Sequence, residues 1–315
     1  MKSPAQAPCW TTTADHRGMR IALKVDVDTY RGTLEGVPAL LALFARYQIK
    51  ASFLFSLGPD HTGRAIRRVF RPGFLSKVQR TSVTEHYGCK TLMYGVLLPG
   101  PHIGRKAGHI MRQVRSQGHE VGIHCYDHVR WHDFVSKKDE KWTRRELERA
   151  IEIFREVFDA PPKLHGAAGW QINQYVPRLE EQMGFTYASD VRGYSPFYPV
   201  MHGIESRCVQ IPTTLPTLDE LIGCNGNTPE NVHHAVLAAS RELRPHGHVY
   251  TLHAELEGMK LLPVMENLLR AWQEREDKIV TLKGLYNNLD LDSLQKKPVV
   301  MGKIPGRAGT LALEV

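Results

Sequence analysis

Two histidines four residues apart form the most informative pattern in this chain. They are His124 and His128 in the stretch HEVGIHCYDH, where a short apolar run, Val121 to Ile123, precedes the first of them. If a strand ends at His124 and a helix begins near His128, both imidazoles can reach one divalent metal ion. Taken alone, such a pair is more often ordinary packing than a metal site, so the prediction needs a third ligand.

A second apolar run, IALKVDVDT at residues 21–29, ends in two carboxylates, Asp26 and Asp28. A metal site made of two histidines and one aspartate keeps a coordination position open for water, which suits hydrolysis. His132 continues the four-residue series. A fourth protein ligand would close the site, so we leave His132 out of the predicted set.

Short apolar runs alternate with longer amphipathic ones along most of the chain, which predicts an α/β fold with a parallel sheet or a closed β/α barrel. Strands are expected at 21–27, 51–55, 120–124, 164–167, 187–190, 209–212, 248–253 and 279–282, and helices at 37–47, 107–117, 143–158, 231–243 and 261–276. Chemically active residues recur where the strands should end: Asp26, Asp28, His124, Asp190 and His253. Active sites of β/α barrels form at that rim, so one barrel domain is favoured.

The domain organisation follows from the same pattern. We expect a flexible lead-in at 1–19, a barrel at 20–290 and a C-terminal tail at 291–315, with an insertion near 58–104 in place of a helix. Residues 64–80 of the insertion contain no acidic residue, and apolar side chains lie between their basic ones, which include Arg64, Arg67, Arg68 and Arg71. That mixture is typical of a protein that binds an anionic bilayer. A solvated basic face is the plainer alternative.

Composition and charge indicate which partners and which cellular compartment to expect. The formal charge of +8 and the pI near 9.2 favour an anionic partner. The basic residues lack the interleaved aromatics and motifs of nucleic-acid binding, so nucleic acid is not expected. Five scattered cysteines predict no disulfide framework and favour a reducing compartment. We expect a cytosolic protein, or one attached to a membrane from the cytosolic side, because neither a secretory signal nor an apolar run of spanning length is present.

Several motifs in this order resemble the polysaccharide deacetylase (NodB-homology) family. VDVDT, HCYDH and YTLH carry the family resemblance, which implies a metal-dependent amide hydrolase on a distorted β/α barrel. Further segments point to one branch of the family: GTLEGVP, FSLGPD, HGAAGW, SDVRG, QIPTTLPTLDE, YTLHAELEG and GRAG. That branch removes the N-formyl group from 4-deoxy-4-formamido-L-arabinose on undecaprenyl phosphate, a step in the lipid A modification that gives polymyxin resistance. The resemblance begins at about Met19.

The resemblance also implies roles for individual residues. Asp26 is expected to act as the base, and Asp28, His124 and His128 to bind zinc, cobalt, manganese or nickel. His253 is expected to be the general acid, paired with Asp190. The family's third motif usually carries an arginine that HGAAGW lacks, so Arg192 is expected to orient the base, and Trp170 to lie at the pocket mouth. The plain alternatives are a capping role for Asp26, a core position for His253 and a structural ion pair of Asp190 with Arg192.

The favoured reading is therefore a deformylase of a lipid-linked sugar at the cytoplasmic face of the inner membrane. Its expected partners are the undecaprenyl-phosphate-linked substrate, the anionic membrane surface and other enzymes of the aminoarabinose pathway. One alternative is a soluble family member that hydrolyses a cyclic imide, a ureide or a chitooligosaccharide. A non-catalytic anion-binding protein is the weaker alternative.

Overall fold

The structure, a computed structural model, describes residues 18–65 and 89–315. Within these residues, a main sheet of eight strands has the order β10-β1-β2-β3-β4-β5-β8, and β9 pairs with β1. All its pairings are parallel. The strands are β1 (Arg20–Val27), β2 (Ser52–Ser56), β3 (Glu120–Cys125), β4 (Leu164–His165), β5 (Tyr187–Ala188), β8 (Val209–Gln210), β9 (His248–His253) and β10 (Lys278–Val280).

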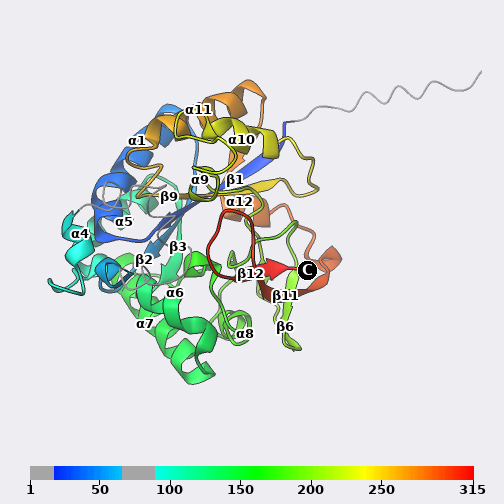
Figure 1. The fold of residues 1–315 in the computed structure, drawn as a ribbon. Helices are drawn as coiled ribbons and strands as arrows, with labels where there is room; N and C mark the ends of the chain where they lie inside the picture. Colours follow the sequence, from blue (N-terminus) through cyan, green and yellow to red (C-terminus); the bar gives the residue numbers. More distant parts are fainter. Residues whose placement is uncertain (1–17, 66–88) are drawn as a thin grey trace, which may run out of the picture.

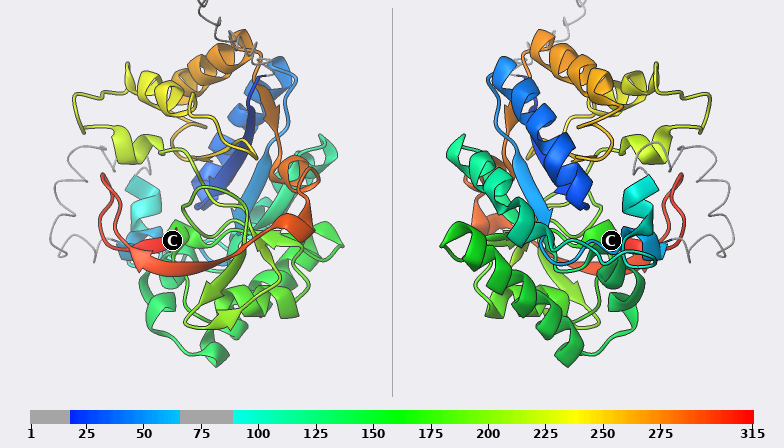
Figure 2. Two further views of the ribbon diagram at one scale, coloured as in Figure 1. Left: turned by 90° about the vertical axis from the view of Figure 1, so that its right-hand side faces the viewer. Right: turned by 90° about the vertical axis from the view of Figure 1, so that its left-hand side faces the viewer.

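Helices surround this sheet (Figures 1 and 2). For example, α5 packs against β2 and β3, and α7 packs against α5 and β3. The α-helices are α1 (Val37–Arg46), α4 (Cys89–Met93), α5 (Ile103–Ser116), α6 (His128–Phe134), α7 (Glu140–Phe158), α8 (Val176–Gln182), α9 (Leu218–Leu221), α10 (Val232–Ala239), α11 (Leu262–Glu274) and α12 (Leu282–Tyr286). Short π or 3₁₀ helices are η1 (Gly32–Gly36), η3 (Val135–Lys137), η4 (Ala168–Trp170) and η5 (Leu291–Ser293).

The chain that follows β8, at one end of the sheet, returns to β9 beside β1. Just after β8, the amides of Thr214 and Leu215 both donate to the carbonyl of Val249 in β9, at 3.1 Å. The expected distorted β/α barrel is therefore confirmed. Strand β1 lies between β9 and β2, and residues 21–27 are buried on both faces, as is usual for a central parallel strand.

A second sheet joins the C-terminal segment to the barrel. It has the order β12-β11-β6-β7, from β6 (Tyr198–Met201), β7 (Ile204–Glu205), β11 (Lys296–Gly302) and β12 (Leu311–Glu314). The amide of Arg192 donates to the carbonyl of Ala312, and the amide of Glu314 donates to the carbonyl of Arg192, both at 2.9 Å. The segment 291–315, which the sequence set apart as a tail, thus packs beside the barrel, and Figure 1 shows it in red.

The insertion after β2 is described in part. Its described residues, 58–65 and 89–104, include α4 and a tight turn at 94–98. Arg67, Arg68 and Arg71 lie outside the described residues, and so do residues 1–17 of the predicted lead-in. Over the described ranges, no helix has the length and apolar character needed to cross a bilayer.

Candidate active site

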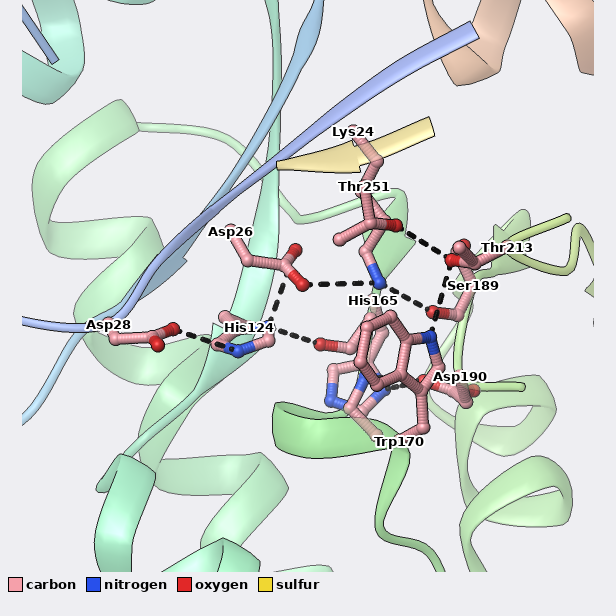
Figure 3. Close-up of polar contacts among 12 residues, drawn as sticks. Lys24, Asp26, Asp28, His124, His165, Trp170, Ser189, Asp190, Thr213 and Thr251 are labelled. Carbon is pink, nitrogen blue, oxygen red and sulfur yellow. Dashed lines mark hydrogen bonds and ion pairs between the residues drawn. The ribbon is translucent and has the colours of Figure 1, made fainter. Parts of the chain in front are cut away.

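The carboxyl ends of β1 and β3 and the start of α6 bring four predicted residues together, and Figure 3 shows three of them, Asp26, Asp28 and His124. One carboxylate oxygen of Asp28, Oδ1, lies 3.2 Å from Nε2 of His124, and the other, Oδ2, lies 3.4 Å from Nε2 of His128. Asp26 Oδ1 lies 3.7 Å from Nδ1 of His124. Local structure explains why His124 and His128 lie so close. Strand β3 ends at Cys125, and Asp127 caps α6 by accepting a hydrogen bond from the amide of Arg130 at 3.0 Å. The helix therefore begins at His128, as the spacing predicted.

The chemistry of these side chains fits a divalent metal. Nδ1 of His124 lies 2.6 Å from the carbonyl oxygen of Gly166, which can only accept, so Nδ1 carries the hydrogen. In the neutral ring, Nε2 of His124 then directs a lone pair at the Asp28 carboxylate, and these two acceptors need either a proton or a metal cation between them. Burial alone would raise the pKa of Asp28, but the imidazoles of His128 and His124 lower it below its usual value. Asp28, His124 and His128 could thus hold a metal between them.

Glu255, which the sequence analysis did not single out, anchors the backbone that carries Asp28. Its Oε1 atom accepts hydrogen bonds from the amides of Asp28 and Thr29, at 3.0 and 2.8 Å, and from the hydroxyl of Thr29 at 2.8 Å. The available signal was its place in YTLHAELEG, two residues after His253. Such support behind a metal ligand fixes the ligand's orientation.

The carboxylate of Asp26 has two differently placed oxygens. Oδ2 lies 3.5 Å from the ammonium nitrogen of Lys24, whereas Oδ1 is buried and has no hydrogen-bond partner among the described residues. Arg192, which was expected to orient this base, instead donates to both oxygens of Glu220, at 2.6 and 2.9 Å, and to the carbonyl of Leu215. Arg192 therefore does not take the expected position beside Asp26.

His253 ends β9 directly beside Asp26, because the two residues are register partners. Burial works to lower the pKa of His253, but the charges of Asp28, Asp219 and Glu257 outweigh burial and raise it. The amide of His253 also donates to Glu257 at 2.9 Å. A raised pKa favours the imidazolium, the form that a general acid requires.

The expected pairing of Asp190 with His253 is wrong. Oδ1 of Asp190 accepts from the amide of Ala167 at 2.6 Å and lies 3.2 Å from Nδ1 of His165, and Oδ2 accepts from Gln210 at 2.8 Å. Asp219, in the segment QIPTTLPTLDE, is one of the carboxylates that act on His253. The family resemblance suggested Asp190 for this role, but the carboxylate of Asp190 faces His165 instead.

His165, Glu180 and Asp190 form a second, fully buried cluster. Nδ1 of His165 lies 2.5 Å from Glu180. Burial would lower the pKa of His165, but Asp190 and Glu180 raise it to about 9, while His165 helps to lower that of Asp190 to about 2. The cluster thus satisfies its own charges. Through Ala167 it holds the HGAAGW loop, whose Gly166 carbonyl orients His124.

Trp170 does not lie where the sequence placed it, whereas Arg64 lies in the insertion. Trp170 is only 1% exposed, and its indole nitrogen donates to Thr213 at 3.2 Å, so it packs inside the barrel rather than at an open mouth. Arg64 is exposed and donates to the carbonyl of Gly95 at 3.0 Å, in the turn of the insertion.

Comparisons with known proteins identify the family of the chain. A sequence model described as polysaccharide deacetylase matches residues 14–188. A probable 4-deoxy-4-formamido-L-arabinose-phosphoundecaprenol deformylase of Shewanella sediminis is 36% identical over 93% of this chain and 94% of its own length. A protein of the same name from Wigglesworthia glossinidia brevipalpis is 31% identical over 90% of this chain and 98% of its own.

Solved structures share the fold. A probable polysaccharide deacetylase from Pseudomonas aeruginosa PAO1 superposes with a TM-score of 0.59 at 16% identity, over 86% of this chain and 91% of that one. The structure of a protein from Mycobacterium smegmatis, also named as a polysaccharide deacetylase, superposes with a TM-score of 0.62 at 18% identity, over 96% of this chain and 99% of that one.

The first prediction concerns the metal ligands. His124→Ala, His128→Ala and Asp28→Asn should each lose bound metal and hydrolytic activity together, because each removes one ligand of a three-residue set. Metal analysis, circular dichroism and turnover are measured on the same preparations. Full metal occupancy in any two of the three variants would overturn the assignment.

The second prediction separates the base from the ligands. Asp26→Asn should keep its metal but lose turnover by about 10²-fold or more, the usual scale for general base catalysis. Metal content measured beside kcat distinguishes the two roles. Release of metal by Asp26→Asn would mean that Asp26 and Asp28 exchange roles.

The third prediction concerns pH. His253 must be protonated to act as an acid, and its pKa is raised, so wild-type activity should fall as pH rises past a point above the ordinary histidine value. His253→Ala should lose most turnover and also this alkaline limb in the kcat profile. An alkaline limb unchanged in His253→Ala would assign the acid to another group.

Proposed function

Because the chain belongs to the polysaccharide deacetylase family, we propose that it hydrolyses the N-formyl group of 4-deoxy-4-formamido-L-arabinose on undecaprenyl phosphate. The products would be formate and the 4-amino sugar lipid used for lipid A modification. The observation that carries the proposal is the convergence of Asp28, His124 and His128 beside Asp26 and His253. Two relatives with the matching deformylase name, aligned over at least 90% of this chain, support the substrate.

Each residue of the site has its own role in the proposed reaction. A divalent metal held by Asp28, His124 and His128 would supply Lewis-acid activation of water and of the formyl carbonyl; we propose zinc, cobalt, manganese or nickel. Asp26 takes the proton of the attacking water through Oδ1, the oxygen without a hydrogen-bond partner in the described part of the chain. The C–N bond then breaks, and the imidazolium of His253 gives a proton to the departing amine.

We also propose that the enzyme works at the cytoplasmic face of the inner membrane. The proposed substrate has a polyprenyl tail that stays in the bilayer, so the active-site rim must come to the headgroups. The insertion starts at that rim, because it leaves the carboxyl end of β2 and returns at α5. Hydrogen bonds tie it there: the amide of Tyr30 donates to Asp60 at 2.9 Å, and His61 lies 2.6 Å from Asp127.

The insertion offers an apolar tip for this contact. Val96, Leu97 and Leu98 are 55%, 76% and 38% exposed. Their amides all donate to the carbonyl of Met93, so the turn holds three aliphatic side chains outward. The basic residues of the 64–80 segment would add attraction to anionic lipid. Contacts with other pathway enzymes remain a prediction from the sequence.

The fourth prediction tests the substrate. Metal-loaded protein incubated with formamido-arabinose on undecaprenyl phosphate should convert it to the amino sugar lipid, which mass spectrometry detects as replacement of formyl by hydrogen. A chitooligosaccharide and a cyclic imide serve as competing substrates. Turnover of either competitor without deformylation of the lipid-linked sugar would favour the soluble amidohydrolase.

The fifth prediction tests the membrane contact. Leu97→Asp should weaken flotation with anionic liposomes, because it places a charge on the apolar tip. Leu243→Asp is a matched control, since Leu243 is 82% exposed but lies after α10. Replacing Arg67, Arg68 and Arg71 together with Glu should abolish binding, since each basic residue near an anionic surface contributes about 1 kcal/mol. Wild-type flotation of both the Leu97 and the triple variant would place membrane contact elsewhere.

A further inference from the structure

Lys24 is a charged side chain held wholly inside the barrel. It lies on β1 two residues before Asp26, so the two side chains share one face of the strand. Its exposed fraction is 0%. The ammonium nitrogen donates to the carbonyl of Ser189 at 2.9 Å, lies 3.5 Å from Oδ2 of Asp26 and lies 5.3 Å from the centre of the Trp170 ring (Figure 3).

A buried ammonium is costly unless its surroundings offset the charge. The Ser189 carbonyl and the face of Trp170 supply partial negative charge, and Asp26 supplies a full one. Space for this ammonium comes from Gly166 in the HGAAGW segment. A Cβ atom at Gly166 would lie closest to Cδ2 of Leu54, and 3.1 Å from Cε and 3.3 Å from Nζ of Lys24, all tighter than ordinary contact. The loop therefore leaves room for a cation that enters from β1.

Neither of the arginine positions considered for holding Asp26 supplies a cation there. HGAAGW contains no arginine. Arg192 is engaged with Glu220 and with the carbonyls of Leu215 and Thr213. Lys24 is thus the cation that the described structure places at Asp26.

We propose that Lys24 is a positioning residue for the reaction: it holds Oδ2 of Asp26 so that Oδ1 stays free to accept the proton of the attacking water. The different surroundings of the two carboxylate oxygens of Asp26 carry the proposal. Oδ2 faces Lys24, whereas Oδ1 is buried without a hydrogen-bond partner in the described residues. Lys24 touches neither the metal ligands nor the substrate in this role and acts through Asp26. The proposal rests on the proposed function in assigning Asp26 as the base.

A double-mutant cycle of Lys24→Met and Asp26→Asn tests this role, with Lys106→Met as a control at an exposed lysine of α5. Lys24→Met should lower kcat by about 10-fold to 100-fold, part of the general-base contribution, with little change in KM. Metal content should stay at the wild-type level. In the Asp26→Asn background, Lys24→Met should cause no further loss of kcat, because the group through which Lys24 acts is already disabled.

Thermal unfolding of the same four proteins gives a readout independent of turnover. Lys24→Met should lower the unfolding midpoint by leaving Asp26 buried and unpaired, and adding Asp26→Asn should recover much of that loss. If Lys24→Met alone fails to fold, a folded double variant supports the pairing, and a double variant that also fails to fold contradicts it.

Results that contradict the proposal differ from those that contradict the proposed function. Wild-type kcat in Lys24→Met would overturn the proposal. So would an equal loss of kcat on adding Lys24→Met to the wild type and to Asp26→Asn. Lys24 would then have only a structural role, in contact with Ser189 and Trp170. Failure of the wild-type protein on every amide substrate would instead overturn the proposed function. The unfolding cycle would still report whether Lys24 and Asp26 are coupled.

Discussion

Charge buried along β1 is the constraint on which the rest of the site depends. Lys24 and Asp26 lie on one face of β1, which is enclosed by β9 and β2, and Asp28 directly follows the strand. An unpaired charge in such a place costs several kcal/mol, so distant parts of the chain must offset each one. Ser189 and Trp170 surround Lys24, His124 and His128 face Asp28, and Glu255 holds the backbone behind it.

Two clusters with similar residue types have different chemical capacities. In the buried cluster, one ring nitrogen of His165, Nδ1, faces both Glu180 and Asp190, so opposite charges meet within the cluster. In the site at the rim, His124 already donates to the Gly166 carbonyl, and its remaining lone pair meets a carboxylate. The first arrangement stabilises a loop, whereas the second presents ligand atoms that suit a metal cation. Because Asp190 holds Ala167 and Gly166 holds His124, the first cluster also positions the second.

The sequence predicted what depends on short spacing, and it failed where long-range packing decides. The strand endings and the helix that begins at His128 are local, so Asp26, Asp28, His124, His128 and His253 could be placed in one site. The partners of Asp190 and Arg192, His165 and Glu220, lie far from them in the sequence, so only the packing of the fold decides these pairs. Lys24 could be read as a buried strand residue, but its role requires knowing that HGAAGW lies across from it.

The most direct test of the account is the crystal structure of the protein loaded with one divalent metal, with anomalous scattering measured at that metal's absorption edge. The account predicts a single strong peak bound by Asp28, His124 and His128, with Asp26 outside the ligand set and still paired with Lys24. A peak among His165, Glu180 and Asp190, or one bound directly by Asp26, would contradict it.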